Sequence, residues 1–314
     1  MGHDQTFKEF LREFLREFLQ LFFPEVEAQI DFSELRFLDS ESFTSFPEGS
    51  SRVADVVAEV RTSEGTREIV LVHVEVQARK RSSFAKRMFQ YYSLLRAKYD
   101  VSIFPIVVYL RGGRTGITDE RHVERLFGKE QLRFRYSAVA LARLEAQEYV
   151  GKSSPVATAL AALMSRKRAP KPAQLWLTMT ERLNRSGLDE ARKLLLLHII
   201  NTYFVIAGAE GEKIERALSQ ERYREVRKMQ MTWAERVEKK GRKEGREEGR
   251  QEGRVEGMLE GRREALLRQL TTKFGPLPEE ITSKVRGVQS LQELDLYLDR
   301  VLVAASLEDM GLRG

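Results

Sequence analysis

The feature that most constrains the fold is a pair of valine-rich segments in which every second side chain points to the same face. Residues 53–60 (VADVVAEV) and 68–77 (EIVLVHVEVQ) both follow the period of two that is typical of β-strands. Ser63, Glu64 and Gly65 lie between them and supply the residue types of a hairpin turn. The sequence therefore predicts a two-stranded hairpin at the centre of a sheet.

Helical patterns flank this hairpin on both sides. Apolar residues recur at steps of three and four from Phe7 to Phe22, with Asp4 as the expected N-cap and Pro24 beyond the end. A short strand is expected at 36–38, a second helix at 83–98 and another strand at 102–110. The predicted order is αβββαβ, which favours an α/β fold with a mixed sheet and helices packed on it.

The rest of the chain is expected to be mainly helical from residue 118 onward, with one strand at 134–141 and helices at 173–185, 188–204 and 212–236. Glycine then recurs at every fourth position from Gly241 to Gly261, among Arg and Glu residues. We interpret this repeat as a solvated charged spacer, while a glycine stripe that lets two helices approach closely is the alternative. The predicted domains are 1–145, 146–238, 239–264 and 265–314, with a homo-oligomer formed through the C-terminal helices.

Composition excludes several classes of site and of protein. The chain has no cysteine, which excludes disulfide-stapled folds, thiolate metal sites and cysteine nucleophiles. The N-terminus lacks the layout of a signal peptide, and the most apolar stretch, 194–209, is too short and too polar to span a bilayer. We therefore expect a cytoplasmic protein with no membrane partner. The net charge of +6 is small, so the placement of the charges carries more information than their sum.

Two carboxylates and an amide are the candidate catalytic residues. The period of two places Glu75 and Gln77 on one face of the second strand, and a hairpin brings Asp55 of the first strand toward Glu75. Unpaired charges in a buried sheet are costly, and a divalent cation offsets that cost. Because Mg²⁺ prefers carboxylate oxygens, water and phosphate oxygens, we expect Asp55 and Glu75 to hold Mg²⁺, or alternatively Mn²⁺.

The following helix carries a one-sided charge. Residues 79–98 contain seven basic residues and no acidic one. Since phosphate contacts dominate the affinity of proteins for nucleic acids, we expect Lys86, Arg87, Gln90 and Tyr91 to contact a phosphate backbone. A basic helix whose side chains are simply solvated is the alternative.

The element order, together with the segments FPEVEAQIDF, RVADVVAEV, VLVHVEVQ, FAKRMFQYY and FPIVVYL, resembles the Rpn-type recombination-promoting nucleases of the PD-(D/E)XK superfamily, which are also described as transposases. The C-terminal tail resembles an uncharacterised helical module that is often fused to such domains. The resemblance implies a restriction-endonuclease-like fold and metal-dependent hydrolysis of DNA in recombination or mobile-element processes. It also implies that Asp55 and Glu75 are metal ligands and that Gln77 occupies a position where the superfamily more often has Lys. Such sites are sometimes completed by an acid of the first helical region, for which Glu17, Glu25 and Glu27 are candidates.

Two functions remain open from the sequence alone. The first is a magnesium-dependent DNA endonuclease. The second is a catalytically weak or inactive protein of the same fold that binds nucleic acid or acts as a protein-interaction scaffold. Other chemistries have no motif: the four histidines lack zinc-ligand spacing, and neither a phosphate-binding loop nor a nucleophile elbow is present.

Overall fold

The structure is a computed structural model, which describes residues 3–38, 56–75, 82–113 and 116–312. Contacts divide the chain into two compact units, Met1–Trp233 and Ala234–Gly314. The predicted four-part division is finer than these two units and stays a prediction. No helix in the described ranges combines the length and the apolar character needed to cross a bilayer.

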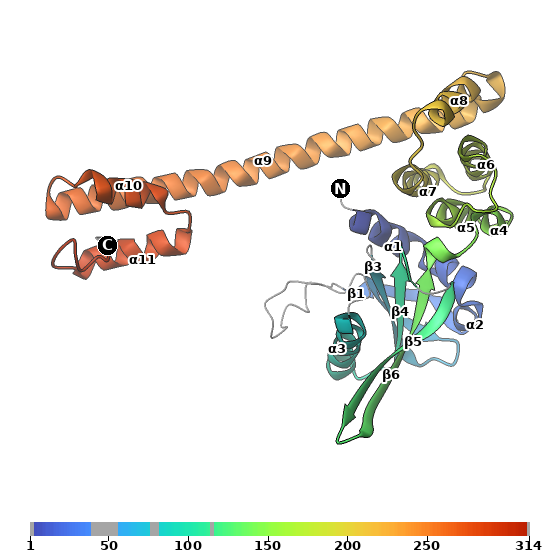
Figure 1. Cartoon of the computed structure of the whole chain (residues 1–314), viewed down its shortest axis with the longest axis horizontal. Helices are drawn as coiled ribbons and strands as arrows, with labels where there is room; N and C mark the ends of the chain where they lie inside the picture. Colours follow the sequence, from blue (N-terminus) through green and yellow to red (C-terminus); the bar gives the residue numbers. More distant parts are fainter. Residues whose placement is uncertain (1–2, 39–55, 76–81, 114–115, 313–314) are drawn as a thin grey trace. The chain divides into compact units, whose positions relative to one another are not determined.

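The first unit is built on a six-stranded mixed sheet in the order β1-β2-β3-β4-β6-β5 (Figure 1). The strands β3 and β4 are parallel, as are β4 and β6, whereas the other neighbours are antiparallel. The strands are β1 Ile30–Leu38, β2 Val56–Thr62, β3 Arg67–Glu75, β4 Ile103–Tyr109, β5 Ile117–Leu126 and β6 Lys129–Ala140. The predicted αβββαβ order and the α/β class are confirmed, with α1 (His3–Phe22), a short α2 (Pro24–Glu27) and α3 (Ser82–Tyr99) as the helices of this region.

The hairpin of β2 and β3 forms as its alternating pattern predicts. Val56 pairs with Val72 and Ala58 pairs with Val70, so the register of the two strands is regular. Val56, Ala58 and Val70 belong to the same buried cluster as helix α1, whereas Val57 and Ile69 belong to the cluster under α3. The period of two therefore divides the sheet into two apolar faces, each covered by one helix.

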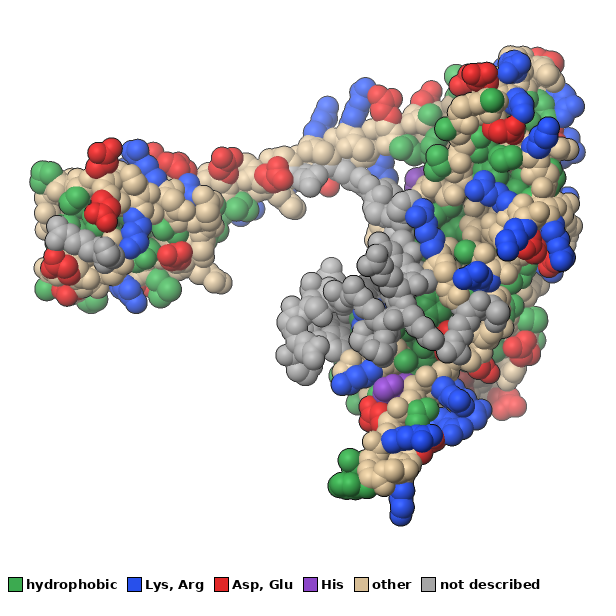
Figure 2. Space-filling view, in the orientation of Figure 1, with side chains coloured by type: hydrophobic (Ala, Val, Ile, Leu, Met, Phe, Trp, Pro, Cys, Tyr) green, Lys and Arg blue, Asp and Glu red, His purple; other side chains and the backbone are tan. Residues whose placement is uncertain are grey.

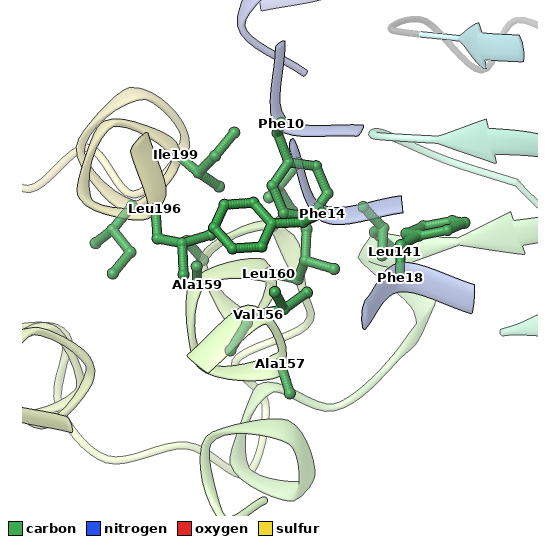
Figure 3. Packing of buried hydrophobic residues seen from close by; sticks show 14 of the residues in the cluster. Phe10, Phe14, Phe18, Leu141, Val156, Ala157, Ala159, Leu160, Leu196 and Ile199 are labelled. Carbon is green, nitrogen blue, oxygen red and sulfur yellow. The ribbon is translucent and has the colours of Figure 1, made fainter. Parts of the chain in front are cut away.

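The largest core lies between the sheet and a group of helices. A row of phenylalanines on α1 faces α5 (Pro155–Leu160) and α7 (Glu190–Tyr203). Figure 3 shows Phe14 near Leu160, Leu196 and Ile199, and Phe18 beside Leu141. Phe10, Phe14 and Phe18 have no exposed surface. The helical part of this unit is thus packed onto the sheet through α1. Its remaining helices are α4 Ala146–Val150, α6 Pro172–Asn184 and α8 Ala209–Leu218.

Two parts of the sequence interpretation differ from the structure. Residues from 118 onward were expected to turn helical, but 117–126 form strand β5, which pairs along its length with a β6 that begins at Lys129. The segment ITDERHVERL is rich in charged residues that favour helices, and cross-strand pairing overrides that preference. The expected helix at 212–236 is also divided, because α8 ends at Leu218 and α9 begins at Arg224.

The second unit has a small core of its own. It contains most of α9 (Arg224–Phe274), α10 (Glu279–Gly287) and α11 (Leu291–Val303). Leu266, Leu270, Ile281, Val285 and Leu294 are at most 1% exposed and form its centre. Ser290 caps α11 by accepting a hydrogen bond from the backbone N–H of Glu293 at 3.3 Å, as the spacing of a capping box predicts. The glycine repeat lies within α9 as continuous helix.

Candidate functional site

The candidate site lies at the carboxyl ends of two parallel strands. Glu75 is the last residue of β3, Tyr109 is the last residue of β4, and the two are partners in the register. Since β3 also pairs with β2 on its other side, position 75 belongs to a central strand of the sheet. The backbone of β3 is therefore held by hydrogen bonds to β2 and β4.

The structure does not test the other two predicted catalytic residues. Asp55 and Gln77 lie outside the described residues, and β2 is described from Val56 onward. Among the described residues, no group of three or more His, Cys, Asp or Glu side chains is placed to hold a metal ion. The donor set itself consists of two carboxylates and one amide, and these hard oxygen donors fit Mg²⁺. The assignment of Asp55 and Glu75 as metal ligands and of Gln77 as a catalytic residue therefore stays a prediction.

The predicted DNA-contacting residues on α3 differ in their surroundings. Lys86 and Gln90 are exposed, on the side of α3 that faces solvent. Arg87 is half-buried, with its guanidinium 5.0 Å from the ring centroid of Phe84. Tyr91 is only 3% exposed and packs in the cluster between α3 and the sheet. Its ring therefore contributes to packing, whereas Lys86 and Gln90 are available to a ligand.

A carboxylate that the sequence interpretation missed lies near Tyr109. Glu120 of β5 accepts hydrogen bonds from the hydroxyl of Tyr109 at 3.1 Å and from the hydroxyl of Tyr136 at 2.8 Å. Burial raises the pKa of Tyr136, and the hydrogen bond to Glu120 raises that pKa further. Both tyrosines thus act as donors and hold the carboxylate in one place.

This triad connects the candidate site to the outer strands. Tyr109 is the register partner of Glu75 on β4, and its hydroxyl reaches Glu120 on β5. The sequence signal for Glu120 was the alternation of Thr118, Glu120, His122 and Glu124, which share one face of a strand. That signal was lost when the segment was interpreted as the start of a helical region.

Aromatic side chains of α3 pack against Tyr109, Tyr136 and His122 on the sheet face that α3 covers. The ring of Phe84 lies 5.9 Å from that of Tyr109 and 6.2 Å from that of Tyr136, measured between centroids. Phe89 stacks on His122 of β5 with a centroid separation of 5.8 Å. Helix α3 is therefore fixed against β4, β5 and β6, and its exposed basic residues have a defined position beside the site.

Comparison with known proteins identifies the family of this region. Residues 1–149 match the family described as "Putative transposase, YhgA-like". This part of the chain is similar to that family, which is PD-(D/E)XK-like. No curated protein and no solved structure matches the chain. The matched range contains the whole six-stranded sheet, together with α1, α2 and α3. The match to this transposase family indicates a nuclease-like function related to mobile elements.

Proposed function

We propose that this protein is a metal-dependent endonuclease that hydrolyses phosphodiester bonds of DNA in recombination or mobile-element processes. The observation that carries the proposal is the end of β3 at Glu75, on a central strand, within the range that matches the transposase family. The basic helix α3 that follows supports a negatively charged substrate, because its described residues 82–99 include four basic side chains and no acidic one.

The proposed metal ion is Mg²⁺, with Mn²⁺ as an alternative, held by the carboxylates of Asp55 and Glu75. When bound, the cation lowers the pKa of a coordinated water and offsets negative charge at the phosphate. Gln77 then orients the water or a phosphate oxygen through its amide, which neither carries a positive charge nor accepts a proton. A slow enzyme is expected, because the ammonium group that usually occupies this position is missing.

The role proposed for the protein's own residues extends to substrate binding. Lys86 and Gln90 contact the phosphate backbone from α3, and Arg87 adds positive charge close to Phe84. Glu120 accepts hydrogen bonds from Tyr136 and Tyr109, and it thereby holds Tyr109 in place. The end of β4 is so maintained beside Glu75. These residues position the DNA and the strand ends and do not enter the reaction.

Nicking of supercoiled plasmid by the full chain tests the proposal. The wild-type protein is expected to nick with Mg²⁺ and to stop when EDTA is added, and Asp55→Ala purified in parallel is expected to lose the activity. Equal nicking by the variant and the wild type would assign the activity to a contaminant. A wild-type protein that binds DNA without nicking it would instead support the scaffold function.

We also propose that the protein self-associates through its C-terminal helices. Leu302 and Val303 at the end of α11 are 71% and 85% exposed, and Leu296 on the same helix is 60% exposed. Apolar side chains gathered at one helix favour contact with a second copy. Light scattering of Leu302→Glu is expected to give a lower mass than the wild type, and an unchanged mass would contradict self-association at this surface.

A further inference from the structure

The outer hairpin of the sheet projects as a two-stranded arm. Strand β6 pairs with β4 only from Ser137 to Ala140, whereas its residues from Lys129 to Tyr136 pair with β5 alone. Residues 120–136 therefore form a ribbon that continues beyond the rest of the sheet, as Figure 1 shows for β5 and β6. We refer to residues 120–136 as the arm.

The tip of the arm exposes an aromatic side chain in an unfavourable backbone conformation. Phe127 is 94% exposed and has a φ of +51°, and the neighbouring Leu126 is 55% exposed. Phe127 and Gly128 (φ +74°) form a two-residue turn between Leu126 and Lys129, and positive φ at both positions is characteristic of a type I′ turn. Asn or Asp is the preferred residue before Gly in such a turn, whereas a bulky residue with positive φ is strained. Neither packing nor turn geometry explains a phenylalanine here.

The charges of the arm are unevenly satisfied. Each of its acidic residues is engaged within the protein: Glu120 by two tyrosines, Glu124 by His122 at 2.9 Å and Glu130 by Arg133 at 2.6 Å. Among the described residues, four basic side chains form no ion pair, namely Arg121, Arg125, Lys129 and Arg135. The hydrogen bond from Arg133 lowers the pKa of Glu130 most, and the charges of Arg121 and Arg125 contribute to lowering it. All four are exposed. With five basic and three acidic residues in 120–136, the arm therefore presents a net positive charge to solvent.

The register concentrates part of this charge. Arg121 and Arg135 are direct partners across β5 and β6, and like charges in such a pair destabilise a hairpin. Because Phe134 and Tyr136 are buried on the α3 side, the alternating Arg133 and Arg135 lie on the opposite side of the ribbon. Figure 2 shows Lys and Arg side chains gathered along this projecting part, with hydrophobic side chains at its end. A polyanion would relieve the repulsion between the two arginines.

We propose that the arm grips duplex DNA, with its arginines on the phosphates and Phe127 inserted as a wedge against a base step. This inference rests on the proposed action on DNA and adds a binding element to it. A two-stranded ribbon fits a DNA groove, and apolar wedges unstack base steps and kink the duplex. Stacking of an aromatic ring on a base tolerates any sequence, since every base presents a π-face. Duplex DNA would thus be the ligand of both the exposed Phe127 ring and the arginines of the arm.

Binding of a fluorescein-labelled duplex to the full chain in EDTA tests the arm apart from any cleavage. Phe127→Asn creates the Asn-Gly pair that suits the turn, so it removes the ring while the melting temperature stays the same or rises. We expect this variant to bind the duplex about tenfold more weakly, and Phe127→Trp to bind as the wild type does. A 2-aminopurine base in the duplex is expected to brighten with wild-type protein and to stay quenched with Phe127→Asn.

A matched pair of arginine variants tests the phosphate contacts. Arg135→Gln is expected to weaken binding several-fold and to reduce the slope of log affinity against log salt by about 1. Arg216→Gln on α8 removes the same charge from an exposed side chain that is paired with Glu212, and it is expected to change neither quantity.

Either of two results for Phe127→Asn would overturn the arm proposal. The variant could bind the duplex as tightly as the wild type does, or it could melt at a lower temperature than the wild type. The nuclease proposal fails separately. If the wild type does not nick while the arm variants lose binding, the arm stands and the endonuclease does not. If Phe127→Asn binds and nicks as the wild type does, the endonuclease stands and the arm does not.

Discussion

Glu75 and Tyr109 lie side by side as the last residues of the parallel strands β3 and β4. The hydroxyl of Tyr109 in turn donates a hydrogen bond to Glu120 of β5. Through this relationship the strand end that carries the proposed metal ligand is connected, by one side chain, to the base of the projecting arm.

The substitution Gln77→Lys is expected to raise the rate of plasmid nicking about tenfold or more. Lysine adds an ammonium charge that stabilises the charge developing on the phosphate, which the amide of Gln77 does not supply. The rate of conversion of supercoiled to open-circular plasmid measures the effect. Gln77→Leu serves as the control and is expected to be slower than the wild type. A Gln77→Lys variant no faster than Gln77→Leu would remove this position from the catalytic account.

The triad around Glu120 predicts a pH-dependent stability difference. Replacing Tyr136 by Phe removes one hydrogen bond to a carboxylate, and we expect a cost of about 1.5–3 kcal/mol in the free energy of unfolding at neutral pH. Because folding raises the pKa of Tyr136, its contribution is fully present below the pKa of the unfolded chain, about 10, and is lost as the pH rises above it. The difference between Tyr136→Phe and wild type should therefore shrink in urea unfolding at strongly alkaline pH.

The control for this measurement is Tyr92→Phe. The ring of Tyr92 packs 5.0 Å from that of Phe134 in the same cluster. This substitution is expected to change the free energy of unfolding little at either pH. A difference for Tyr136→Phe that grows with pH would contradict the assignment of Tyr136 as a buried, protonated donor.

Truncation of Phe10 to alanine tests the packing of α1 between the sheet and the helices. The side chain is fully buried, with its ring 5.7 Å from that of Phe14. We expect a loss of about 3–5 kcal/mol in the free energy of unfolding, because the substitution removes a large apolar side chain and leaves a cavity. Urea titration followed by tryptophan fluorescence measures it, with Leu94→Ala, at a 38% exposed position, as the mild control. Similar losses in both variants would show that α1 does not hold the two parts together.

The glycines within α9 and the glycine just after it predict opposite effects for two alanine variants. A β-carbon added at Gly245, Gly249 or Gly253 meets no atom within 4 Å, so the triple alanine variant should gain about 1 kcal/mol per position from helix propensity. Gly275, just beyond the end of α9, has a φ of +79°, and Gly275→Ala should lower the melting temperature. Thermal melts by circular dichroism compare them. Earlier melting of the triple variant would assign the glycines to close contact with a second helix.

The sequence predicted the inner sheet well because period and burial agree there. Val56, Ala58 and Val60 of β2 enter one core together with Val70 of β3, whereas Val57 and Ile69 enter the other, as the alternating pattern predicts. Strand β5 was missed because its burial is incomplete: charged residues occupy both of its faces, and only pairing with β6 makes it a strand. Glu120 was missed with it. The glycine repeat is helical although glycine has a low helix propensity. Six glycines weaken the helix there, and few apolar residues support it. Asp55 and Gln77 are predictions of pattern and resemblance alone, because they lie outside the described residues.

The most direct test of the central claim is the nicking rate of Glu75→Gln against that of Glu68→Gln in the presence of Mg²⁺. Both residues lie on β3, and both substitutions replace a carboxylate by an amide of the same shape. If Glu75 holds the metal ion, Glu75→Gln should nick at least about a hundredfold more slowly than the wild type, while Glu68→Gln nicks at the wild-type rate. Equal rates for the two variants would contradict a metal-dependent nuclease site at the end of β3.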